Sequence, residues 1–209
     1  MPDKNSNLKH NVNLMEYPLW FQNEKLAENL EVGFTWSDQE GYVYRSGYKV
    51  PTKTDGIFLL FFLLLSQQEN YSTEISVSRY RVLKSCGFGV DTGWYSRLKE
   101  SLNRWLRVDL SFEGKFFDGK KYRDMAFHII DAWTLDEKTR ELKIRFSPEF
   151  LSMMKGRGFF KYINFNEVKA LRAPLATRLF EILSKSFHNR SHWKCNAVRL
   201  AKKIPMSER

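Results

Sequence analysis

The stretch GWYSRLKESLNRWLRVDLSF, from Gly93 to Phe112, has the pattern of a helix that runs directly into a strand. At about 100° per residue, Leu98, Leu102 and Trp105 fall in one sector of the helix, which predicts that this sector faces a core. VDLSF then alternates apolar and polar residues, as a strand with one buried face does. The opposite sector of the helix is polar and basic, so it faces either water or a ligand.

The neighbouring segments place this helix third in a recognisable order. IFLLFFLLL at 57–65 is a buried helix with Thr54 or Asp55 as its cap, and a second helix from about Ser76 to Cys86 closes at glycine. MAFHIIDAW at 125–133 and ELKIRF at 141–146 have the pattern of strands, and EGKFFDGKKYR forms a long basic hairpin before them. Three helices, a strand, a hairpin and a strand predict an α+β fold containing a winged helix-turn-helix.

Composition narrows the class of protein. The chain has 209 residues, 43% of them hydrophobic, so it is large enough to bury a core. Its formal charge of +10 must be either solvated by water or neutralised by an anionic partner, which could be nucleic acid, anionic lipid or an acidic protein. Cys86 and Cys195 have no CxxC spacing, which is typical of a reducing compartment and predicts a cytoplasmic protein. The apolar run at 57–65 has nine residues where a membrane span needs about 20, so we expect no membrane association.

Patterning divides the chain into three expected parts. Residues 1–16 are polar and asparagine-rich, which predicts a disordered N-terminus. Residues 17–163 form the first winged-helix domain, beginning with the aromatic cluster YPLWF at 17–21. Residues 164–209 are expected to form a linker and an incomplete second winged helix, ending before its recognition helix. This last part carries ten lysines or arginines against three glutamates.

Three segments carry a family resemblance: VPTKTDGIFLL at 50–60, YSRLKESLNRW at 95–105 and INFNEVKALRAPLATRLFEIL at 163–183. In these the chain resembles the plasmid replication initiator proteins with tandem winged-helix domains, the replication initiator protein A family. The resemblance implies binding of double-stranded DNA at origin repeats, a homodimer in some states, and contacts with host replication proteins. It implies no catalysis and no cofactor.

The polar face of the quoted helix is the first candidate DNA surface, because a helix fits the major groove of B-DNA. Asparagine pairs with adenine and arginine with guanine, so Asn103 and Arg104 are the expected base contacts. The side chains expected nearer phosphates are Ser96, Arg97, Lys99 and Arg107. Glu100 lies among them and repels phosphate unless it accepts from cytosine or pairs with Arg97 or Arg104. A solvated face or a dimer contact is the alternative.

The basic hairpin is the second candidate DNA surface. Its cations can follow a phosphate backbone, and they are Lys115, Lys120, Lys121 and Arg123. A soluble loop is the alternative. Arg79, Arg81 and Lys84 on the preceding helix have the pattern of a solvated helix surface.

Other chemistries find little support in the sequence. His188, His192 and Cys195 have ligand-like spacing, but no fourth ligand is near, so we expect no metal site. Gly87, Gly89 and Gly93 follow a helix and lack the GxxxxGK pattern of a phosphate-binding loop. The sequence thus favours a non-catalytic initiator. A winged-helix transcriptional repressor and a winged-helix protein-interaction domain remain alternatives, and a nuclease is disfavoured by the missing histidine and carboxylate cluster.

Overall fold

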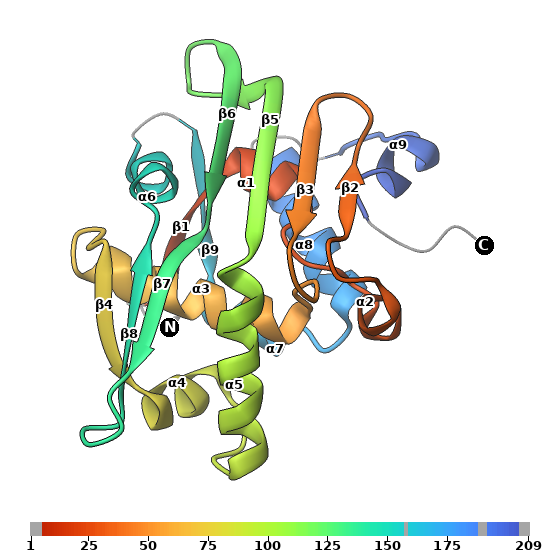
Figure 1. Cartoon of the computed structure of the whole chain (residues 1–209). Coiled ribbons are helices and arrows are strands. Elements are labelled where there is room, and N and C mark those ends of the chain that lie inside the picture. Colours follow the sequence, from red (N-terminus) through yellow and green to blue (C-terminus); the bar gives the residue numbers. More distant parts are fainter. Residues whose placement is uncertain (1–5, 157–158, 188–191, 205–209) are drawn as a thin grey trace.

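The computed structural model describes residues 6–156, 159–187 and 192–204, which form a mixed α and β structure (Figure 1). The strands are β1 (Asn7–Asn11), β2 (Thr35–Ser37), β3 (Tyr42–Ser46), β4 (Glu74–Ser78), β5 (Val108–Phe117), β6 (Tyr122–His128), β7 (Ile130–Leu135), β8 (Glu141–Phe146) and β9 (Phe160–Asn164). The helices are α1 (Val12–Glu16), α2 (Glu24–Asn29), α3 (Lys53–Gln68), α4 (Arg79–Cys86), α5 (Thr92–Trp105), α6 (Pro148–Lys155), α7 (Phe165–Ala170), α8 (Pro174–Phe187) and α9 (Ala197–Ala201).

Helix α3 is the centre of the core. Every residue from Asp55 to Ser66 is buried, as the apolar run predicts. A capping box starts the helix: the Asp55 carboxylate accepts from the Thr52 backbone N–H at 2.7 Å, and the Thr52 side chain accepts from the N–H of Asp55. Trp20 of the aromatic cluster lies so close to Gly56 that a Cβ there would approach its ring to 2.6 Å. Only glycine fits at this position of the helix.

Helices α4 and α5 form a helix-turn-helix beside α3. Gly87 ends α4 in the left-handed region at φ 79°, and the Asp91 side chain caps α5 by accepting from Trp94 N at 3.0 Å. Phe88 stacks on Trp94 with ring centroids 4.4 Å apart, which fixes the turn. The predicted third helix is therefore confirmed, whereas the second begins only at Arg79: residues 76–78, expected at its start, belong to strand β4, and Ser78 is its N-cap.

The strands pair in an order that the sequence reading did not foresee. A three-stranded sheet has the order β4-β8-β7, and the basic hairpin β5–β6 belongs to a different sheet, of order β2-β3-β5-β6. In Figure 1 the tip of β5–β6 points to the opposite end of the molecule from α4 and the N-terminal end of α5, whereas the β7–β8 turn lies beside α4. The short turn at 136–140 therefore lies next to the helix-turn-helix, and the tip of the long hairpin does not.

The N-terminal expectation is wrong for residues 6–16. Strand β1 pairs with β9 in an antiparallel register from Asn7↔Asn164 to Asn11↔Phe160, and α1 follows it, buried along most of its length. The asparagines that looked like a disordered tail carry structural bonds. Asn11 caps α1, and the Asn13 amide exchanges two hydrogen bonds with the Phe117 backbone, at 2.9 and 3.1 Å. Residues 1–5 lie outside the described residues.

The described residues show no division into two separately packed parts at the expected domain boundary between residues 163 and 164. Phe165 of α7 packs on Phe61 of α3, with ring centroids 5.8 Å apart. Helix α8 packs on α1. The segment expected to open a second winged helix therefore packs on α3 of the expected first domain and on α1 of the N-terminal part, and its Arg178 is fully buried.

Candidate nucleic-acid interface

The exposed stripe of α5 is narrower than its sequence suggests. Ser96 and Lys99 are exposed and Asn103 is half-buried on the solvent face of the helix, and Arg107 is exposed in the turn that follows the helix end at Trp105. The wheel sets Leu98, Leu102 and Trp105 against the core, and all three are at most 1% exposed. Four of the six residues expected on this surface are thus brought together.

Arg104 does not belong to this surface. It is 6% exposed, and its guanidinium donates to the Asp55 carboxylate at 2.8 Å, a carboxylate that is itself fully buried. Trp105 donates to the backbone oxygen of Asp55 at 2.9 Å, so the end of α5 is fastened to the start of α3. The expectation that Arg104 reads a base is therefore wrong, because the side chain is held inside by an ion pair.

Arg97 also turns away from the exposed stripe. Its guanidinium lies 3.4 Å from the Thr52 hydroxyl and 3.9 Å from a Glu24 carboxylate oxygen, at the junction with α2 and the start of α3. About a third of the side chain is exposed. Arg97 thus borders the candidate surface without sharing the direction of Asn103.

Glu100 is engaged by a residue that the sequence did not single out. The Tyr48 hydroxyl is hydrogen-bonded to the Glu100 carboxylate, and this bond is the main cause that raises the pKa of Tyr48. The Arg107 guanidinium lies 5.5 Å from the centre of the Tyr48 ring and donates to the Asn103 backbone oxygen at 3.2 Å. Tyr48 therefore binds the Glu100 carboxylate on this face, and its ring lies against the Arg107 guanidinium.

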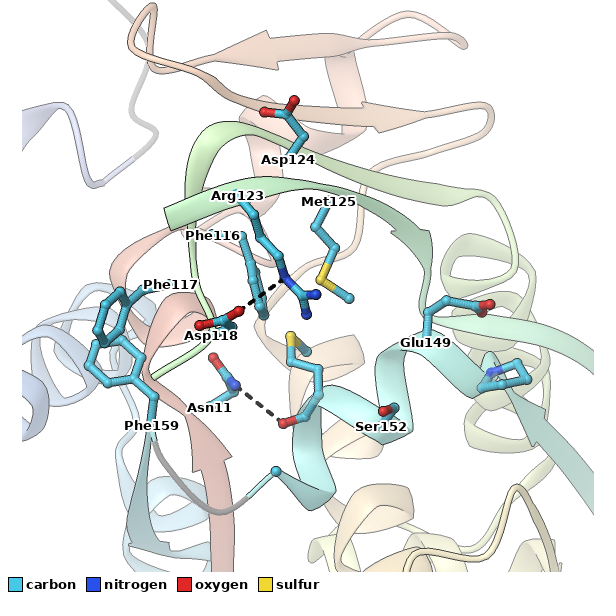
Figure 2. Close-up of a pocket in the computed structure, with 13 residues that line it drawn as sticks. Asn11, Phe116, Phe117, Asp118, Arg123, Asp124, Met125, Glu149, Ser152 and Phe159 are labelled. Carbon is cyan, nitrogen blue, oxygen red and sulfur yellow. Dashed lines mark hydrogen bonds and ion pairs between the residues drawn. The ribbon is translucent and has the colours of Figure 1, made fainter. Parts of the chain in front are cut away.

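The hairpin cations are divided between solvent and ion pairs. Lys120 and Lys121 are exposed at a turn held by the Asp118 carboxylate, which accepts from both backbone N–H groups at 2.9 and 3.0 Å and whose pKa is lowered mainly by them. Lys115 lies 3.7 Å from Glu40. Arg123 turns toward a pocket of about 530 Å³ and lies 3.8 Å from the Asp118 carboxylate (Figure 2). Of these four cations, Lys120 and Lys121 are therefore the most available to a phosphate backbone.

Two cations near α4 escaped the sequence reading. Lys138 and Arg140 are exposed in the β7–β8 turn, which lies beside α4 in Figure 1. Arg81 and Lys84 are exposed on α4 itself. The signal was present in DEKTR at 136–140, but the turn is short, and the longer hairpin drew the assignment of the wing.

Among the described residues, no group of three or more histidine, cysteine, aspartate or glutamate side chains is placed to hold a metal ion. His188 of the suggested trio lies outside the described residues. Within the same part of the chain, no helix is long and apolar enough to cross a membrane.

The sequence matches the profile of replication initiator protein A over residues 9–208. The chain belongs to this family. Its fold is similar to the crystal structure of a selenomethionine derivative of domains 2 and 3 of RctB, with a TM-score of 0.51 and 14% identity. That match covers 75% of this chain and 64% of the RctB chain, so this chain spans less than two thirds of its length.

A second crystal structure of RctB domains 2–3 matches with a TM-score of 0.43 and 13% identity, over 82% of this chain and 69% of that one. No curated protein matches the sequence. The match with the TM-score of 0.51 agrees with the mixed α and β fold, and the profile match places the chain in a replication initiator family.

Proposed function

We propose that this family member initiates plasmid replication by binding double-stranded DNA at origin repeats, without catalysis. The observation that carries the proposal is the exposed stripe formed by Ser96, Lys99 and Asn103 on the second helix of a helix-turn-helix, and by Arg107 in the turn after that helix. That helix enters the major groove in proteins that use this motif. Titration against random and origin-repeat duplexes at two salt concentrations tests the proposal.

The surrounding elements support a winged-helix interpretation of the unit. Helices α3, α4 and α5 precede β7 and β8, and β8 lies between β4 and β7 in the sheet. On this interpretation the β7–β8 turn is the wing, and its Lys138 and Arg140 meet phosphates that flank the groove. Asn103 lies in the middle of the exposed stripe, and its side-chain amide has the donor and acceptor that pair with adenine in the major groove.

Asn103→Ala is expected to weaken binding to an origin-repeat duplex by about 1–3 kcal/mol and to change binding to a random duplex much less, because a base contact carries sequence information. Fluorescence anisotropy on both duplexes measures the two affinities. Asn29→Ala, at an exposed position on α2, is the control. Equal losses on both duplexes would contradict base reading by Asn103.

The wing assignment predicts a difference between the two basic turns. On a duplex only long enough for α5 and its flanking phosphates, Lys138→Gln with Arg140→Asn should lower the slope of log K against log salt by about 0.9 per lost contact. Asparagine is used at 140 because Arg140 has a φ of 58°, which asparagine tolerates.

Lys120→Gln with Lys121→Gln is the matched control, since it removes the same charge from the opposite end of the molecule (Figure 1). The control should leave the slope on the short duplex unchanged. A loss of slope from the hairpin variant alone would reverse the assignment and restore the long hairpin as the wing.

A further inference from the structure

A second, more polar pocket of about 390 Å³ lies where the end of α1, the part of the β5–β6 hairpin next to its turn, α8 and α9 meet. Figure 1 shows α9 and the hairpin at the end of the molecule away from α4 and the N-terminal end of α5. The charged and phenolic side chains that face the pocket are Glu16, Tyr17, Glu40, Lys115, Tyr122, Lys185 and Arg199. None of them lies on the exposed stripe of α5.

Each carboxylate at this pocket is already shared by two lysines. The two oxygens of Glu16 pair with Lys185 and Lys203. Glu40 lies 3.7 Å from the Lys115 ammonium and 3.8 Å from that of Lys202.

The guanidinium of Arg199 adds a further positive charge. Arg199 lines the pocket, and no carboxylate pairs with it within the described part of the chain. The pocket therefore keeps an excess of positive charge after its own acids are counted. Lys185 reflects this crowding: burial, with Lys203 and Arg199 nearby, lowers its pKa to about 8.

A buried arginine joins the end of α1 to the segment after α9. Arg178 donates to the backbone oxygens of Met15 and Glu16 at 3.0 and 2.7 Å and to that of Lys203 at 2.9 Å. The end of α1 and the segment after α9 are thus held by one guanidinium that is itself fully buried. Glu16, which pairs with Lys185 at the pocket, is therefore held at its backbone before any ligand arrives, and such preorganisation lowers the entropy cost of binding.

We propose that this pocket binds a phosphate group, with Arg199, Lys185 and Lys115 as its ligands. An arginine offers two parallel N–H donors to phosphate, and lysines add mobile point charges, so together they match a tetrahedral oxyanion. The proposal does not depend on the α5 surface and stands apart from the function proposed above. The phosphate belongs either to the backbone of a nucleic acid or to a free nucleotide.

The test compares wild type with Arg199→Ala, using Lys194→Ala as the matched control. Lys194 is exposed, lies five residues away and does not line the pocket. Calorimetric titrations use adenosine triphosphate, and anisotropy titrations use a 20-nucleotide duplex over a range of salt. Lys115→Ala is a second variant, and thermal unfolding checks that each protein is folded.

Loss of one charge-assisted contact should weaken binding about tenfold in Arg199→Ala and leave Lys194→Ala within about twofold of wild type. If this difference is seen with the triphosphate, the ligand is a free nucleotide. If only the duplex responds, with a salt slope lowered by about one, the ligand is a backbone phosphate. Equal behaviour of Arg199→Ala and Lys194→Ala with both probes overturns the proposal.

Asn103→Ala separates this site from the α5 surface. It should leave triphosphate binding unchanged, because Asn103 lies on a different helix and lines no part of the pocket. Failure of the pocket proposal therefore leaves the α5 proposal standing, and the reverse also holds.

Discussion

Arg104→Ala is expected to lower the free energy of unfolding by about 3–5 kcal/mol, because it leaves the Asp55 carboxylate buried without a cation. Asp55 is fully buried and its only ion pair among the described residues is with Arg104, at 2.8 Å. Denaturant unfolding followed by circular dichroism measures the loss. The same variant, at a temperature where it is folded, should bind random and origin duplexes with the same ratio as wild type.

Arg97→Ala is the control for this prediction, since it removes the same kind of side chain about two turns earlier on the same helix. Its ion pair with Glu24 is 3.9 Å long and half exposed on the glutamate side, so the loss should stay below about 1 kcal/mol. A loss in Arg104→Ala no larger than that in Arg97→Ala would show that the buried pair contributes little beyond the packing of the side chain.

This pair also shows how far the sequence alone reaches. Periodicity correctly placed α3, α5 and the part of α4 from Arg79, missed strand β4 before it, and set Leu98, Leu102 and Trp105 against the core. The same helical wheel placed Arg104 among the exposed polar residues, because a charged residue is usually at the surface. Its partner Asp55 lies 49 positions away, and no local spacing reveals that distance. The sequence therefore predicted which helix face is exposed, whereas the residues that lie on that face could be known only from the tertiary structure.

Strand pairing was the larger failure, and its cause is also non-local. β1 pairs with β9, and even the nearest paired residues, Asn11 and Phe160, are 149 positions apart in the sequence. The polar residues of β1 and α1 have the sequence pattern of solvated residues, and only the structure shows which backbone groups they bond. The hairpin β5–β6 has the length and charge expected of a wing, but β5 pairs with β3 and so joins another sheet. Alternation predicts that a strand exists and which face is buried; it does not say which strand lies beside it.

The second large effect is expected at the contact between α8 and α1. Arg178 is fully buried and donates to the Glu181 carboxylate at 2.9 Å as well as to the backbone oxygens of Met15, Glu16 and Lys203. Burial raises the pKa of Glu181 to about 7, and the nearby guanidinium opposes that rise. One side chain thus joins the two ends of the described chain and partly offsets the cost of burying a carboxylate.

Arg178→Met is expected to lower the free energy of unfolding by about 3–5 kcal/mol at pH 8, because Glu181 and three carbonyl oxygens lose their donor. The loss should be smaller at pH 6. Without Arg178 the folded-state pKa of Glu181 rises further above its unfolded value, so the protonated carboxyl is favoured in the folded protein and stability falls as pH rises through that pKa. Below it, the neutral carboxyl no longer needs a cation.

Denaturant unfolding at pH 6 and pH 8 measures the difference, and adding Glu181→Leu should abolish the pH dependence while leaving the loss from the three carbonyls. An equal loss at pH 6 and pH 8 in Arg178→Met would mean that the backbone contacts alone hold α8 on α1, and that Glu181 stays protonated across this range.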